Sequence, residues 1–142
     1  YATSSDYRLK ENIDYNFDAT TRLKQLKPAR FNWISDSDNT LLDGFIAHEV
    51  TSIVPEAVTG TKDATKTLEN VILNADGSFF KQNISQADWI MHKAEGTFAN
   101  DTTWVATHTM PEYQGIDQSK LVPLLIKTIQ ELEARIKTLE DA

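Results

Sequence analysis

Residues 119–140 read SKLVPLLIKTIQELEARIKTLE, the most regular apolar pattern in the chain. Its apolar side chains recur at alternating gaps of three and four residues, at Val122, Leu125, Ile129, Leu132, Ile136 and Leu139. This is a heptad repeat with β-branched residues at position a and leucine at position d, a pattern typical of parallel coiled coils. Three heptads are short for an isolated helix in water, so partner helices are expected. The pattern predicts a C-terminal coiled-coil helix over residues 119–142, with these six side chains in its interface.

The expected helix begins with recognisable signals. Ser119 is a plausible N-cap, and Pro123 falls in the first turn, where its missing N–H costs little. The alternative is a single amphipathic helix that packs only on its own domain. A stripe of two apolar residues per heptad is narrower than the usual globular face, and we therefore favour association between chains.

Residues 1–118 predict a small mixed α+β domain with short helices and strands. A short helix is expected over 19–27 and a strand over 29–34, with another apolar strand or strand-to-helix entry over 44–50. Residues 60–112 are rich in Thr, Asp, Asn and Gly, and we interpret them as a β-rich insertion. Within it, Gly77 marks the turn of a hairpin between residues 71–73 and 79–80, and residues 104–110 form another candidate strand. The tryptophans are expected to be packing residues.

Composition excludes several classes of function. The net charge of −7 argues against a nucleic-acid surface, and no apolar run is long enough to cross a membrane. The chain has no cysteine, and its three histidines lack metal-ligand spacing, so no metal site is expected. His48 is expected to be a polar residue at the edge of the core or in an interface. Because the chain begins at Tyr1, we expect it to be part of something longer.

Four blocks of residues carry a family resemblance. The first is residues 5–13, SDYRLKENI, which contains the pattern S-D-x-R-x-K-x-x-I. The others are Leu23, Leu26, Pro28, Phe31 and Trp33; residues 44–50 with 55–58; and residues 115–117 leading through Leu121, Pro123 and Leu124 into the closing helix. In order and spacing, these blocks resemble the intramolecular chaperone domain at the C-terminus of phage endosialidases, tail spikes and neck appendages. Two departures are His48, where the family usually has Gln, and Gln118, where Tyr is common.

The resemblance implies a homotrimer and a self-cleaving serine endopeptidase that turns over once. Residues 1–118 would be the chaperone and autoprotease domain, with the cleavage segment at 4–13, and the six heptad residues would form the trimer interface. The family's domain follows a β-structured spike of the same chain and holds three chains together while they wind. The resemblance further implies folding in the bacterial host cytoplasm, a parent protein in the virion tail or appendage, and release of this domain after cleavage. No cofactor is required, and ATP remains open as a ligand, although no nucleotide motif supports it.

Ser5 and Lys10 are the catalytic dyad that the resemblance implies. A serine hydroxyl needs a base to take its proton, and a lysine amine serves only when neutral, a form that apolar burial favours. Residues five apart diverge on a helix and face opposite sides of a strand, so a turn or a contact between chains is required. The family cleaves at its Ser–Asp step, here Ser5–Asp6, whereas hydroxyl attack on the preceding carbonyl would break Ser4–Ser5. The sequence leaves both bonds open.

Two other functions share the same fold. One is a structural trimerisation tip that is never cut off, which differs from the leading hypothesis only at Ser5 and Lys10. The other is a receptor- or glycan-binding head, to which the tryptophans of the 60–112 insertion would point.

Overall fold

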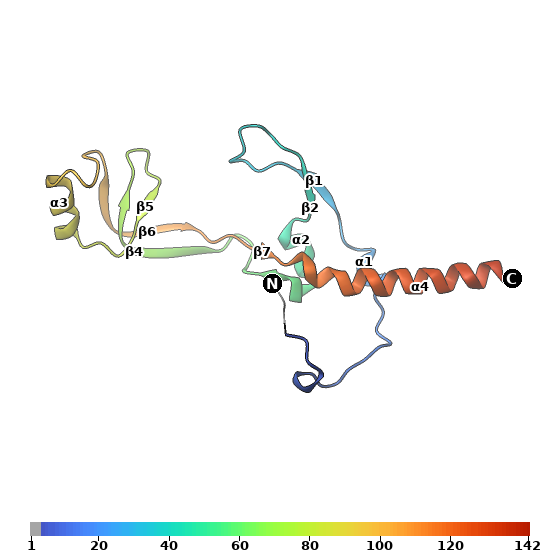
Figure 1. The fold of residues 1–142 in the computed structure, drawn as a ribbon. Helices are drawn as coiled ribbons and strands as arrows, with labels where there is room; N and C mark the ends of the chain where they lie inside the picture. Colours follow the sequence, from blue (N-terminus) through green and yellow to red (C-terminus); the bar gives the residue numbers. More distant parts are fainter. Residues whose placement is uncertain (1–3) are drawn as a thin grey trace. The chain divides into compact units, whose positions relative to one another are not determined.

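The computed structural model describes residues 4–142 and shows two compact units (Figure 1). The first unit contains the residues up to Val58 together with Ile116–Ala142, and the second unit is Thr59–Gly115. Helices occur together with small antiparallel sheets in the chain, which confirms the mixed α+β class.

Short elements and one long helix make up the first unit. In chain order they are η1 (Tyr7–Leu9), α1 (Thr20–Leu23), β1 (Ala29–Phe31), β2 (Leu42–Gly44), α2 (Ala47–Thr51), η2 (Pro55–Ala57), η3 (Gln118–Leu121) and α4 (Val122–Glu140). Strands β1 and β2 pair antiparallel, with Arg30 opposite Asp43. Strands β3 (Val58–Thr59) and β7 (Gly115–Ile116) form a second two-stranded sheet.

The core of the first unit joins residues that are far apart in sequence. Six buried side chains form it: Ala19, Val50, Val54, Ala57, Leu121 and Leu124. Leu23, Leu26 and Phe45 pack against this cluster from its rim. The beginning of α4 is therefore fixed on the chain's own N-terminal half, as apolar burial requires.

The early elements are shorter than the sequence predicted. The helix expected over 19–27 ends at Leu23, because 3₁₀-type bonds from Gln25 N to Arg22 O and from Leu26 N to Leu23 O tighten the chain ahead of Pro28. The strand expected over 29–34 ends at Phe31. Trp33 is 60% exposed and meets the edge of the Phe31 ring at a centroid distance of 5.4 Å, so the expectation that Trp33 is a packing residue is wrong for the single chain.

The entry to α4 also differs from the expectation. Asp117, rather than Ser119, is the N-cap residue, and it caps the 3₁₀ turn η3 instead of α4 itself. Its carboxylate accepts hydrogen bonds from Ser119 N at 3.1 Å and Ser119 Oγ at 2.6 Å. The 3₁₀ turn η3 comes first, and the α-helix begins at Val122 with Pro123 in its first turn, as predicted. Aspartate and serine are comparable capping residues, so the sequence signal did not discriminate between them.

A three-stranded antiparallel sheet organises the second unit. Its strands are β4 (Thr65–Leu73), β5 (Phe79–Lys81) and β6 (Thr103–Pro111), in the order β5-β4-β6. The predicted hairpin is confirmed: Asn74 N bonds Ser78 O across the turn, and Gly77 has a φ of +83°, a conformation that glycine adopts without strain. The predicted strand at 104–110 is confirmed as part of β6.

Helix α3 (Gln86–Ala94) was not predicted. Its signals are present in the sequence, since Ser85 caps it by accepting from Asp88 N, and Gly96 follows its end with a φ of +76°. The insertion is therefore less purely β than expected. Trp89 and Trp104 are half-buried, as packing residues should be, and their indole N–H groups donate to Thr102 Oγ1 and Ile84 O.

Candidate functional site

A single 3₁₀ turn brings the predicted dyad together. Leu9 N bonds Asp6 O and Lys10 N bonds Tyr7 O, both at 3.1 Å, which closes the turn η1. As a result Lys10 Nζ donates to Ser5 Oγ at 2.5 Å. The turn that the five-residue spacing demanded is thus present within one chain. With the amine neutral, the same contact would let Lys10 accept the hydroxyl proton.

Asp6 closes the turn with its side chain. Its carboxylate accepts Arg8 N at 2.9 Å, and it also receives Arg8 Nε at 2.9 Å and Arg8 Nη2 at 3.0 Å. The Arg8 side chain, and then its backbone N–H, holds the pKa of Asp6 below its ordinary value. Asp6 therefore stays ionised at neutral pH and remains paired with Arg8.

The predicted cleavage segment is open to solvent in the single chain. Every residue from Ser4 to Asp18 is exposed, and Tyr7 and Leu9 are exposed by 77% and 73%. Beside the dyad lies a hollow of about 480 Å³ lined by Ser4, Asp6, Arg8 and Leu9. The apolar side chains of Tyr7 and Leu9 lie next to the predicted dyad, but within one chain they do not shield it from water.

Helix α4 presents two different faces. Leu124 and Thr128 are buried against the chain's own core, together with Leu121 just before the helix. The predicted interface residues lie on another face and remain exposed: Val122, Leu125, Ile129, Leu132, Ile136 and Leu139. The helix therefore does pack on its own domain, yet it does so without using the heptad positions. Ile126 is also exposed, at 53%.

Glu131 ties α4 to the start of α1. Its carboxylate accepts Ala19 N at 3.3 Å, Thr20 N at 3.1 Å and the Thr20 hydroxyl. The bond from the Thr20 side chain is the main reason that the pKa of Glu131 is lowered. A carboxylate at a helix N-terminus satisfies backbone N–H groups that have no partner within the helix. Together with the burial of Leu124 and Thr128, this contact holds one side of α4 on the first unit and leaves the heptad face directed outward.

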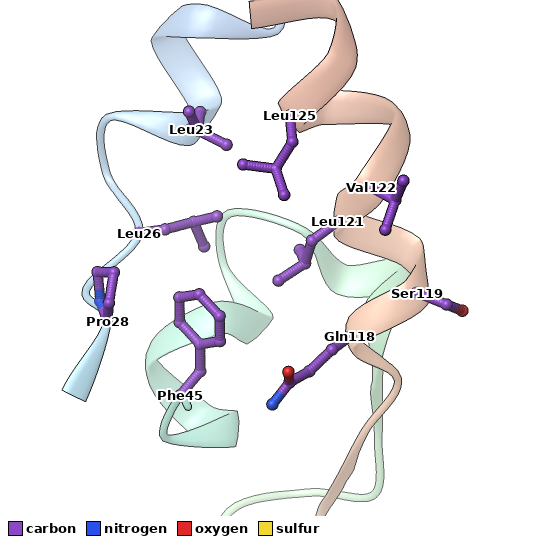
Figure 2. A pocket seen from close by; sticks show the side chains of 9 residues that line it. All are labelled: Leu23, Leu26, Pro28, Phe45, Gln118, Ser119, Leu121, Val122 and Leu125. Atoms are coloured by element: carbon purple, nitrogen blue, oxygen red, sulfur yellow. The ribbon is translucent and has the colours of Figure 1, made fainter. Parts of the chain in front are cut away.

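An apolar cavity of about 490 Å³ opens beside the first heptad (Figure 2). Leu23, Leu26 and Phe45 line one part of it, and Val122 and Leu125 of α4 line another. The remaining lining residues are Pro28, Gln118, Ser119 and Leu121. Two of the predicted interface residues thus face an unfilled apolar space, as a surface prepared for another helix would.

The two faces of α4 predict contrasting effects of truncation. Leu124→Ala removes a core side chain and is expected to lower the unfolding free energy by about 2–4 kcal/mol at every protein concentration. Ile129→Ala removes a 65% exposed side chain and is expected to act only through association, so its effect should grow with concentration. Urea unfolding at several concentrations measures both, and equal effects of the two variants would contradict the division of faces.

The remaining candidates stay apart from the dyad. His48 lies exposed on α2, at neither the core nor its edge. Among residues 4–142, no three acidic or histidine side chains gather in a way that could hold a metal ion. Within the same described part of the chain, no helix has the length and apolar character needed to cross a bilayer.

The segment that holds the dyad also carries the family signal. Residues 5–59 match the family Peptidase_S74, chaperone of endosialidase. The match confirms the resemblance noted from the sequence: over these residues the chain is similar to the chaperone of endosialidase, a family named for a serine peptidase activity. No curated protein matches the chain.

The family match covers part of the site. Ser5, Asp6, Arg8 and Lys10 lie inside it, whereas α4 and the whole heptad face lie outside. Sequence reasoning missed the roles of Asp6, Arg8 and Glu131. The spacing of Asp6 and Arg8 is the signal of an Asx turn and could have been found, but a contact between residues as distant as Glu131 and Thr20 leaves no local signal.

Proposed function

We propose that this chain is the C-terminal intramolecular chaperone of a trimeric phage tail-spike or appendage protein, and that it releases itself by a single serine–lysine cleavage. The observation that carries the proposal is the 2.5 Å contact between Lys10 Nζ and Ser5 Oγ inside the segment that matches the chaperone family. A lysine held on a serine hydroxyl is the minimal arrangement of nucleophile and base.

Assembly switches the dyad on. An exposed ammonium group is charged and well hydrated, and it cannot take a proton from Ser5. When neighbouring chains cover Tyr7 and Leu9, the apolar surroundings favour the neutral amine. Cleavage then reports that the chains have come together correctly, which is what a chaperone that removes itself must sense.

The scissile bond is Ser5–Asp6. Lys10 takes the Ser5 hydroxyl proton, the oxygen adds to a carbonyl carbon, and the proton passes to the departing Asp6 amine. The resulting ester is then hydrolysed by water. A hydroxyl that attacked its own carbonyl would close a strained four-membered ring, so the attacking Ser5 belongs to a neighbouring copy. Cleavage at Ser4–Ser5 would instead be a reaction within one chain.

Three copies associate through the heptad face of α4. β-branched residues at a with leucine at d alone favour two strands, but a helix of 19 residues does not set the number by itself. The open cavity beside Val122 and Leu125 leaves room for apolar side chains of a further helix, which suits a bundle of three. A nucleus for a three-chain β-structured spike must also have three chains.

Release makes the spike permanent. Three chains wind around one another in the bacterial host cytoplasm while this domain holds them in register. Once the domain has left, an unfolded chain has no nucleus for refolding, so unfolding of the spike is irreversible. The lifetime of the assembled spike in the virion is then set by its rate of unfolding. No cofactor takes part in this scheme.

The test is a fusion that places a soluble protein ahead of Tyr1. On expression in bacteria it is expected to separate into two fragments, and mass spectrometry should find Asp6 as the first residue of the smaller one. A first residue of Ser5 would contradict attack between chains. A fusion that assembles but stays whole would identify the chain as a permanent trimerisation tip and contradict the protease proposal.

A further inference from the structure

We propose that Asp6 and Arg8 are positioning residues for the cleavage, because together they hold the turn in which Lys10 reaches Ser5. The inference deepens the proposed function and rests on it. The Asp6 carboxylate and the Arg8 guanidinium bind each other rather than the dyad, so neither side chain gives or takes a proton in the cleavage.

The clamp consists of one capping bond and one forked ion pair. The cap is the bond from Arg8 N to Asp6 Oδ1, which fixes the backbone at the start of the turn. The fork joins Arg8 Nε to Asp6 Oδ1 and Arg8 Nη2 to Asp6 Oδ2. A fork of this kind fixes direction as well as distance, and arginine is the side chain that can make it.

The turn depends on these local bonds because the core does not hold it. All residues from Ser4 to Asp18 are exposed, so no buried side chain anchors the segment before Ala19. Two backbone bonds close the 3₁₀ turn, and a turn of three residues is not stable on so few bonds. The clamp therefore sets how large a fraction of chains has Lys10 on Ser5 at any moment.

Four variants of the fusion test this role. Arg8→Ala and Arg8→Lys both abolish the fork while they keep the backbone cap, and each is expected to slow cleavage by up to about fivefold, the effect of losing an exposed ion pair. Asp6→Asn keeps a capping side chain but loses the charge, so a smaller loss is expected. Asp6→Asn combined with Arg8→Ala should be no slower than Arg8→Ala alone, since both act on one clamp.

Two readouts separate positioning from other roles. The mass of the assembled protein should stay unchanged in all variants. In a plot of cleavage rate against pH, the midpoint of the transition should stay the same and only the maximal rate should fall, because the base is the same Lys10 in every variant.

The outcomes are distinct. Arg8→Lys cleaving as fast as the unaltered chain would show that the charge matters and the fork does not, which overturns the inference. So would an unchanged rate for Arg8→Ala, or a shifted midpoint of the pH profile. If the unaltered fusion itself is not cut, the proposed function fails, and the positioning role falls with it.

Discussion

Ser5→Ala and Lys10→Ala are each expected to leave the fusion whole, with cleavage slowed at least about a thousandfold. Alanine at position 5 removes the hydroxyl to which Lys10 Nζ donates, and alanine at position 10 removes the proposed base. Because the two groups act as a unit, the double variant should be no slower than either single one. Gel analysis over hours after induction measures the loss.

Matched controls come from elsewhere in the chain. Ser37→Ala and Lys66→Ala remove an exposed serine and an exposed lysine that lie outside the turn, and both variants should be cut at the ordinary rate. The proposed attack of Ser5 on a neighbouring chain predicts that a tagged Ser5→Ala chain expressed together with the unaltered chain is cut inside mixed trimers. If a Ser5→Ala fusion expressed alone were cut, the serine mechanism would be excluded.

Glutamate at both Ile129 and Leu132 is expected to abolish association and, with it, cleavage. An uncompensated buried carboxylate costs about 3–5 kcal/mol, which exceeds the roughly 1.5–3 kcal/mol that burying an isoleucine or leucine side chain contributes. Two such changes in every helix are therefore expected to prevent the α4 helices from associating through the heptad face. The single chain should still fold, since Ile129 and Leu132 do not belong to its core.

Sedimentation measures the assembly. The unaltered 142-residue chain should sediment at about three times its 16.0 kDa mass, and the double glutamate variant at one times that mass. Glutamates at Ala134 and Thr138, which lie on α4 away from the heptad positions, add the same charge and should leave both assembly and cleavage intact. A dominant species of twice the monomer mass would show that the heptad rule had prevailed over three-fold assembly. Cleavage by a monomer would refute the coupling.

The features best predicted from the sequence depend on local periodicity. The heptad repeat predicted α4, alternation with a glycine turn predicted the β4–β5 hairpin, and the five-residue spacing of Ser5 and Lys10 required the turn that is found. Each pattern repeats, or closes, within a few residues, so no knowledge of distant partners is needed.

The features missed depend on competition between neighbours or on contacts over long distances. Asp117 and Ser119 both qualify as caps, and only the backbone path decides between them. Helix α3 was overlooked because the surrounding polar residues are equally typical of turns. The inward face of α4 is held by the burial of Leu124 and by the bond from Thr20 N, at the start of α1, to Glu131. Thr20 lies 111 residues before Glu131, so this contact exists only once the chain has folded.

The pairing of β3 with β7 has a consequence for how this sequence can change. Thr59 and Gly115 begin and end the second unit, and they lie so close that a side chain on Gly115 would come within 2.9 Å of Thr59 Oγ1. The chain therefore enters and leaves the second unit at adjacent positions. Any compact segment whose two ends lie close together could take the place of this unit. The family match ends at residue 59, where the chain enters the second unit. Replacement of the second unit by another segment of this kind is expected to preserve Ser5, Lys10 and the heptad residues, which all belong to the first unit.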